Sequence, residues 1–314
     1  MAMTTRLDII NKLLIALLCI IVFAPSKTYA QQEPIYSQYM FNMAQVNPAY
    51  AGNRAANSIT ALFRKQWVNV PGSPSTGYLT WDTRNKGSNV GYGIQVFNDH
   101  IGLENSLGAK GLYSFRIPLN KSFLSFGLSA GVVNYRVDLR SAMTTEGGDP
   151  MFQENVNRIL PTAGVGVIFA TKSFYAGLSA PAILETKVST NKAPITTSAS
   201  NHYFLTTGYI FELSEAVKLK PSIMAKGVLG APMSFDYNMN VWILDMIGVG
   251  ASYRMGDAII GIFELQLSSE FRLGYAYDYS ISTMNTFSKG THELMLRYEF
   301  SHSKSEQILS PRYY

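Results

Sequence analysis

The sequence predicts an all-β protein, a transmembrane antiparallel β-barrel of about 14 strands. First, apolar and polar residues alternate through most of the chain, in runs of about ten residues. Second, aromatic residues form 12% of the chain and gather near the ends of these runs, as in the aromatic girdles of outer-membrane barrels. Third, no apolar stretch after position 30 approaches the ~17–25 residues of a spanning helix.

Residues 1–30 have the pattern of a secretory signal peptide. Basic residues precede an apolar run from Leu13 to Phe23, and small residues suited to cleavage end at Ala30. We therefore expect a mature N-terminus at Gln31, with an uncleaved anchor helix as the alternative. The one cysteine, Cys19, lies in the apolar run, so the processed chain is expected to hold neither a disulfide nor a cysteine metal site.

Residues 31–56 precede the first alternating run and are expected to form a plug in the lumen or a segment on the periplasmic face. Side chains at spacings of three and four predict a short helix, carried by Tyr36, Tyr39, Met40 and Met43. It should stop at Asn47, because Pro48 disfavours helical backbone in the residue before it. The alternative is that Asn47, Pro48 and Gly52 only shape the turn into the first strand.

Residues 57–300 are expected to form the barrel. Successive strand side chains point to opposite faces, so each run has one apolar and one polar face. A soluble sandwich also alternates, but the export signal and the Gly- and Ser-rich polar faces favour a barrel, which must close because lipid cannot pair free backbone groups. The expected strands are 59–67, 75–81, 92–97, 107–117, 123–135, 163–169, 174–180, 203–213, 217–226, 235–243, 247–253, 259–267, 271–279 and 294–300.

The connections divide into short and long. Residues 120–121 and 171–173 are expected to be tight periplasmic turns, whereas 138–160 and 181–201 are long and polar, as outer loops are. Alternation of strand direction agrees with this assignment. The tail after the last strand, 301–314, is expected to pack in the lumen, reach a periplasmic partner or remain disordered.

Charge and motif patterns argue against several other functions. The net charge of +5 is too small, and its basic residues too scattered, for a nucleic-acid partner. A G-x-S-x-G motif spans 127–131, but the alternation continues through it with no helix behind, so Ser129 is expected to be a luminal polar residue rather than a nucleophile. The histidines lack metal-ligand spacing, and no catalytic residue, metal or cofactor is expected.

Several short motifs, in order along the chain, carry a family resemblance. They are PIYSQYMFNMAQVNPAYAG at 34–52, RKQW at 64–67, PGSP at 71–74, GDP at 148–150 with Phe152, GYAYD at 274–278, GTHEL at 290–294 and SPRYY at 310–314. Together they resemble the PorP/SprF family of outer-membrane proteins, associated with type IX secretion and gliding motility. Tyr314 departs modestly from a common terminal Phe.

The resemblance implies a non-enzymatic barrel in the outer membrane of a Gram-negative cell, in contact with its lipid. Such barrels help deliver, anchor or present a secreted cargo with a C-terminal sorting domain, and meet type IX secretion components at the periplasmic face. The alternative is a plugged barrel that transports small apolar solutes. Candidate residues for the plug or a partner are Tyr36, Gln38, Tyr39, Asn47, Pro48, Gly52 and Trp67; for outer-loop contacts Asp149, Pro150 and Phe152; for tail contacts Pro311, Arg312, Tyr313 and Tyr314. Trp67 can equally be an interfacial anchor.

Overall fold

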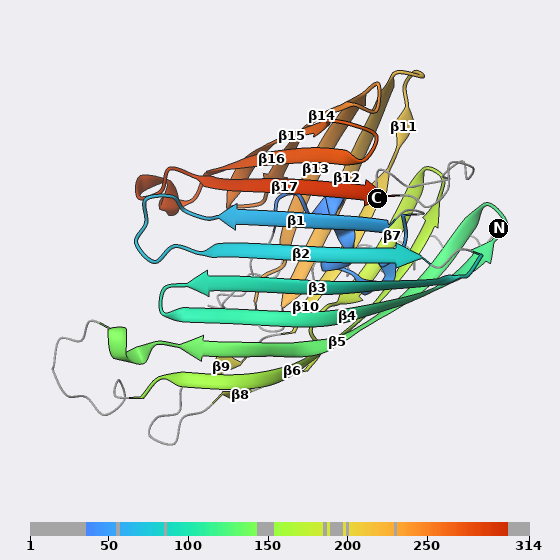
Figure 1. Cartoon of the computed structure of the whole chain (residues 1–314). Coiled ribbons are helices and arrows are strands. Elements are labelled where there is room, and N and C mark those ends of the chain that lie inside the picture. Colours follow the sequence, from blue (N-terminus) through green and yellow to red (C-terminus); the bar gives the residue numbers. More distant parts are fainter. Residues whose placement is uncertain are drawn as a thin grey trace, which may run out of the picture.

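The predicted all-β barrel is confirmed. The structure is a computed structural model that describes residues 36–54, 57–84, 87–142, 154–184, 187–188, 197–198, 201–228 and 231–300. One antiparallel sheet of fifteen strands closes into a barrel where its last strand pairs with its first (Figure 1). Two of these strands, β10 and β11, pair with consecutive parts of β12, so the barrel has 14 spans.

The first half of the wall consists of seven strands. They are β1 (Asn57–Lys65), β2 (Ser75–Arg84), β3 (Val90–Ile101), β4 (Glu104–Leu119), β5 (Ser122–Val137), β6 (Val156–Thr171) and β7 (Phe174–Ala180). Of these, β4, β5 and β6 are the longest of the barrel, with 16 residues each. The second half consists of β10 (His202–Tyr209), β11 (Phe211–Glu212), β12 (Val217–Val228), β13 (Ser234–Ile243), β14 (Ile247–Arg254), β15 (Ala258–Gln266), β16 (Phe271–Ser280) and β17 (Thr291–Phe300). A separate small sheet pairs β8 (Lys187–Val188) with β9 (Thr197–Ser198).

Burial in the barrel is the reverse of that in a soluble protein. On β1 the apolar Phe63 is 54% exposed, whereas the neighbouring Arg64 is 1% exposed. On β15 Ile259 and Phe263 are exposed, whereas Glu264 is buried. An apolar surface therefore faces lipid and charged side chains face the interior, as a closed sheet in a bilayer requires. Among the described residues, no helix has the length and apolar character needed to cross a membrane.

The strand connections gather at two rims with different loop lengths. One rim carries tight connections such as 120–121, where Asn120 has φ 46°, and 172–173; we call it the short-turn rim. The other carries 66–74, 138–155, 181–201 and 281–290, and we call it the long-loop rim. The first and last strands begin and end at the short-turn rim, because the number of spans is even. In bacterial barrels this rim is periplasmic and the longer loops are extracellular.

The connection expected at 138–160 is shorter than the sequence suggested. It holds a 3-10 turn, η4 (Leu139–Ser141), and β6 already begins at Val156 and pairs with β5 along its whole length. The polar residues that open β6 suggested a loop, but the ladder with β5 carries them into the sheet. The paired partner β7 meets β6 only over 165–170, so Pro161, which has no N–H to donate, lies where β7 makes no pairs.

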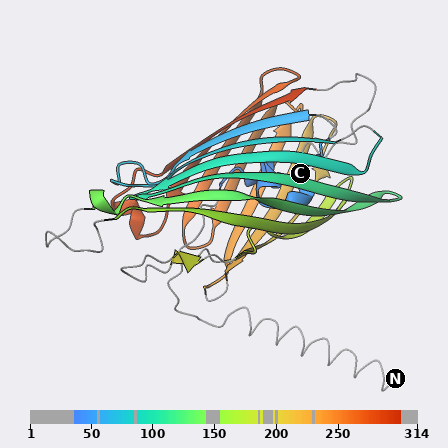
Figure 2. The same ribbon diagram turned by 60° about the horizontal axis from the view of Figure 1, so that its bottom comes forward.

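Residues 36–54, the luminal segment, lie inside the barrel (Figures 1 and 2). The predicted short helix is wrong, because the segment forms three 3-10 turns: η1 (Tyr39–Phe41), η2 (Met43–Gln45) and η3 (Pro48–Tyr50). Asn42, with φ −135° and ψ 62°, separates the turns η1 and η2 because its backbone is not helical. Asn47 is extended, with φ −139° and ψ 112°, as expected for a residue before proline.

Candidate functional site

The luminal segment runs along the barrel from the long-loop half to the short-turn rim. Its first residues, Ser37 and Gln38, bond to Glu293, the third residue of β17, near the long-loop rim. Its last residue, Arg54, lies 3.7 Å from Glu299, at the opposite end of the same strand. The segment therefore spans most of the height of the wall.

The outer end is held by three buried charged side chains, Arg64, Asp278 and Glu293, which we call the latch. The Glu293 carboxylate accepts the N–H groups of Ser37 (2.9 Å) and Gln38 (2.7 Å). Arg64 donates to Glu293 at 3.0 Å and to Asp278 at 2.8 Å, and Asp278 also accepts the Ser37 hydroxyl at 2.7 Å. Arg254 adds a second cation 3.7 Å from Asp278. Buried charges are tolerated when they are paired and hydrogen-bonded in this way.

The middle of the segment is bonded to the wall through its backbone carbonyls. Short 3-10 turns leave many carbonyls without a partner inside the turn. Wall side chains donate to four of them: Gln95 to Ala44 (3.0 Å), Ser179 to Val46 (2.9 Å), Ser125 to Ala49 (3.0 Å) and Ser114 to Ala51 (2.6 Å). These four donors come from β3, β4, β5 and β7, so the middle of the segment is tied to one continuous arc of the wall.

Asn47 anchors the segment against β6. Its side-chain oxygen accepts the Ala49 N–H at 2.9 Å and caps η3, while its amide group donates to the Val167 carbonyl at 3.1 Å. Pro48 follows as the first residue of η3. Two wall glycines permit this approach: a Cβ on Gly166 would lie 2.0 Å from the Asn47 side-chain oxygen, and one on Gly127 would lie 2.0 Å from the Ala49 nitrogen.

A methyl group at Gly166 should therefore weaken the protein by about 1–3 kcal/mol, the usual cost of overpacking. The matched control is Gly261→Ala, because a Cβ at Gly261 would meet nothing within 4 Å. Chemical unfolding of the two refolded variants in detergent micelles measures the difference. Equal unfolding free energies would show that Asn47 does not hold the segment against β6.

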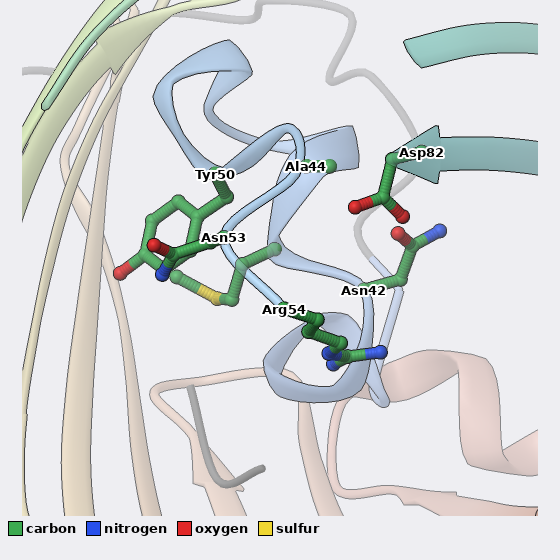
Figure 3. Close-up of a pocket in the computed structure, with 7 residues that line it drawn as sticks. Asn42, Ala44, Tyr50, Asn53, Arg54 and Asp82 are labelled. Atoms are coloured by element: carbon green, nitrogen blue, oxygen red, sulfur yellow. The ribbon is translucent and has the colours of Figure 1, made fainter. Parts of the chain in front are cut away.

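The inner end turns into β1 at Gly52. This residue has φ 62°, and its N–H donates to Asp82 at 3.0 Å. Arg54 donates to the Phe41 carbonyl at 2.7 Å and so closes the segment on itself. The pocket in Figure 3, lined by the segment and Asp82, has room for about one water molecule. Gly52 thus shapes the turn, and the lumen around it is tightly filled.

Aromatic side chains fill the remaining contacts of the segment. The Tyr36 ring meets the Tyr78 ring edge-on at 5.1 Å, and Tyr78 stacks on Phe97 at the same centroid distance. The Tyr39 hydroxyl accepts a hydrogen bond from Asn238 at 2.7 Å.

The other candidate residues lie elsewhere. Trp67 lies in the connection 66–74 at the long-loop rim, half-buried, with φ 44° and its N–H donating to the Thr291 hydroxyl at 3.2 Å. These contacts tie Trp67 to the long-loop rim and not to the luminal segment. The candidate loop and tail residues lie outside the described part of the chain: Asp149, Pro150, Phe152, Pro311, Arg312, Tyr313 and Tyr314.

Sequence reasoning missed the latch, although its members stand in three of the motifs. Arg64 opens RKQW, Asp278 closes GYAYD and Glu293 lies in GTHEL, while Ser37 and Gln38 belong to the first motif. Alternation places all three charged residues on luminal faces near strand ends, and that combination is the signal that points to them. Pairing of β1 with β17 and of β17 with β16 then brings them together.

No chemistry beyond binding is evident in the described residues. β5 runs straight through the G-x-S-x-G motif, and Ser129 faces the interior with 7% exposure. The sharp strand-to-helix turn of a hydrolase elbow is missing there. The described residues also contain no cluster of three or more His, Cys, Asp or Glu side chains placed to bind a metal.

A family comparison decides what kind of barrel this is. The family model described as type IX secretion system membrane protein PorP/SprF matches residues 28–298. The chain belongs to the PorP/SprF family. Membership and the 14-span barrel together place this PorP/SprF protein in the outer membrane, within type IX secretion, and are consistent with a non-enzymatic role. No curated protein matches the chain.

Solved structures share the fold at low identity. The CymD monoaromatic hydrocarbon channel aligns with a TM-score of 0.52 at 12% identity, over 87% of this chain and 95% of that one. The Ralstonia pickettii toluene transporter TbuX gives 0.49 at 10% identity, over 82% and 93%. A Pseudomonas aeruginosa FadL homologue gives 0.45 at 11% identity, over 85% and 95%. At such identity, only the likeness to CymD carries weight, and it shows the barrel fold alone.

Proposed function

We propose that this PorP/SprF protein is a sealed, non-enzymatic barrel that helps deliver, anchor or present a secreted surface protein bearing a C-terminal sorting domain. The observation that supports this most is the luminal segment, which is bonded to the wall at both ends and along its middle. A filled lumen leaves the rims and loops as the surfaces on which the protein acts. Its function is therefore recognition.

The two rims suit two different partners. The long-loop rim offers a broad surface, including the connection 281–290, in which Phe287 is 71% exposed. A large exposed aromatic side chain at a rim is a typical anchor for a protein partner. The short-turn rim, which faces the periplasm, is where components of the secretion machinery would dock. Cargo recognition is thereby assigned to the outer rim and machinery contact to the inner one.

Gentle detergent extraction from native membranes tests this proposal. We expect one large secreted protein to co-purify with the barrel in a fixed ratio, and its surface level to fall several-fold in a deletion strain. The variant Phe287→Ala should weaken capture of the secreted protein without lowering the amount of folded barrel. An unchanged surface proteome in the deletion strain would contradict the proposal.

Transport of small apolar solutes is the competing function, and CymD, whose name is that of a monoaromatic hydrocarbon channel, shares the fold. Vesicles containing the purified protein should take up toluene no faster than protein-free vesicles, because the segment fills the lumen. Uptake well above that background, with no protein partner captured, would favour transport instead.

A further inference from the structure

The part of β6 nearest the long-loop rim is paired on one side only. β6 pairs with β5 along all of its 16 residues, whereas β7 pairs only with residues 165–170 of β6. Just past the end of β7, the Ile183 N–H donates to the Ala163 carbonyl at 2.8 Å. The described part of the chain holds no strand that pairs with residues 156–162 on this side, and we call these residues the open edge.

We propose that an extended segment of the secreted surface protein adds to the open edge as a further β-strand. The unpaired N–H and C=O groups of an exposed edge are a template for another strand, and main-chain hydrogen bonds supply the affinity of such additions. The proposal rests on the proposed function, because it states how the long-loop rim would hold the secreted protein.

The open edge stands outside the bilayer. The 16 residues of β6, at about 3.3 Å each and tilted by about 40°, rise about 38 Å, whereas the apolar band of a barrel is about 25 Å tall. Because the tight turn 172–173 fixes the other end of β6 at the short-turn rim, the excess length lies at the long-loop rim. The exposed Arg136, opposite Asn157 in the ladder, is a side chain that suits water and not lipid. Unpaired backbone groups are therefore tolerated at this height.

The ladder determines which backbone groups the open edge offers. In an antiparallel strand, the N–H and C=O groups of one residue point to the same side, and those of the next residue point to the opposite side. The Ala163 carbonyl points away from β5, toward Ile183, so the groups of Asn157, Ile159 and Pro161 point away from β5 as well. Pro161 offers only its carbonyl, because proline has no N–H. The edge thus presents the N–H groups of two residues and the carbonyls of three.

Packing holds the open edge in an extended conformation. The ends of β5 and β6 are joined by a separate cluster of buried apolar side chains, Tyr135, Val137, Leu139 and Val156. On the opposite face of the strand, the Ile159 side chain is 74% exposed. A strand that is already ordered loses little conformational freedom when a partner pairs with it. The open edge is therefore a preorganised and accessible binding surface.

A second copy of this chain does not fit the open edge. Two barrels in one membrane have the same orientation, so both β6 strands run from the long-loop rim to the short-turn rim. Across a twofold axis, two strands that are each tilted by about 40° cross at about 80°, whereas paired strands are rotated by only about 20–25°. The added strand therefore belongs to a polypeptide that can align with β6 above the membrane.

The charge of the open edge indicates the chemistry of the added strand. Arg158 is the one charged residue within positions 156–162, and its side chain is exposed. Opposite charges on neighbouring strands stabilise the pairing of those strands. We therefore expect an acidic residue in the added strand beside Arg158.

Hydrogen exchange tests the pairing directly. In the purified barrel without a partner, the amide protons of Asn157 and Ile159 should exchange rapidly, because they face solvent. In the complex obtained by gentle extraction, they should exchange at least about 100-fold more slowly. The amide protons of Arg158 and Leu160, which face β5, are the internal control and should exchange slowly in both samples. Rapid exchange at Asn157 and Ile159 in the complex would overturn the proposal. Slow exchange in the barrel alone would overturn it too, because the edge would then already be paired.

A proline substitution tests the same pairing in cells. Ile159→Pro removes an N–H that points away from β5, so the barrel should still assemble, as it does with Pro161 two residues further on. Surface retention of the co-purifying protein should fall about tenfold, because a carbonyl of the added strand loses its donor. Ile159→Ala is the matched control, since it removes the side chain but keeps the N–H, and should change retention much less.

The expected acidic residue has its own variant. Arg158→Glu should lower retention several-fold, because two acidic side chains would then face each other across the added pair. Lys121→Glu, an equal change of charge at an exposed position of the short-turn rim, is the matched control and should leave retention unchanged. Equal retention by these two variants would show that no acidic residue lies beside Arg158.

These results separate strand addition from the proposed function. If the proline and alanine variants retain the same surface protein equally, the proposed function stands and strand addition alone is overturned. If the unchanged barrel retains no surface protein at all, the proposed function fails, and strand addition fails with it.

Discussion

Replacing Arg64 with alanine is expected to destabilise the protein by about 3–5 kcal/mol, the cost of removing one partner from a buried ion pair. The Arg64 guanidinium bridges Glu293, Asp278 and the Ser37 hydroxyl, and each member of the latch is at most 4% exposed. Without it, two carboxylates remain buried close together. Arg254 still lies 3.7 Å from Asp278, but Glu293 then keeps only the N–H groups of Ser37 and Gln38, which do not neutralise its charge. The outer end of the segment should therefore also loosen.

Unfolding by guanidinium in detergent micelles measures the loss of stability, and limited proteolysis of the folded protein measures the release of the segment. Lys172→Ala is the matched control, because Lys172 pairs with Glu212 at 3.4 Å while its side chain is 73% exposed. An exposed pair of this kind contributes at most about 1 kcal/mol. If the two substitutions cost the same, the latch does not hold the segment.

The barrel could be predicted because its constraint is local and repeats along the whole chain. Each strand must alternate between lipid-facing and lumen-facing residues. The alternation from Phe271 onward therefore marks β16 in the sequence, and the structure shows the same alternation of burial. Alternation along β15 and β16 also puts Glu264 and Arg272 on the luminal face, where the two side chains pair at 2.7 Å. The requirement that a sheet in lipid must close supplied the remaining step.

The start of β6 could not be predicted, because the rule weakens outside the bilayer. Val156 to Leu160 carry polar neighbours such as Asn157 and Arg158, and a loop has the same composition. What makes them a strand is the ladder with β5, in which Val156 pairs with Val137. The pairing of β6 with β5 is made by residues far apart in the sequence. Where neither face of a strand touches lipid, its residues need not alternate, so the sequence gives no sign of the strand.

The 3-10 turns of the luminal segment escaped prediction for a different reason. Spacings of three and four around Tyr39 suggested a helix, since helical turns usually satisfy their own backbone. Inside the barrel, however, wall side chains such as Gln95 and Ser125 satisfy the carbonyls instead, so irregular 3-10 turns become stable. The latch likewise depends on tertiary proximity: Arg64 and Glu293 meet only because the barrel closes between its first and last strands.

Deleting residues 36–54 is expected to turn a silent barrel into an open, water-filled channel. Barrels of 8 strands are filled by their own side chains, whereas barrels of 16–18 strands hold an aqueous channel. With 14 spans, this barrel lies nearer to the second group, so the segment is what fills the lumen. Its removal exposes polar wall groups such as Gln95, Ser114 and Glu293, which water can solvate.

Planar-bilayer recordings measure this effect. The full-length protein should give no steady current, while the deletion variant should give ohmic steps of weak ion selectivity. The selectivity is weak because the wall retains cations such as Arg254 and Arg297 and anions such as Asp236 and Glu264. Removing residues 32–35 alone is the matched control and should leave the barrel silent, because that deletion stops short of the latch. Should the large deletion fail to assemble, the double change Arg64→Ala and Glu293→Ala keeps the segment but frees its outer end, and should give intermittent openings. A steady current through the full-length protein itself, as large as that of the unlatched protein, would show that the segment does not seal the barrel. Recognition at the rims would then lose its main support.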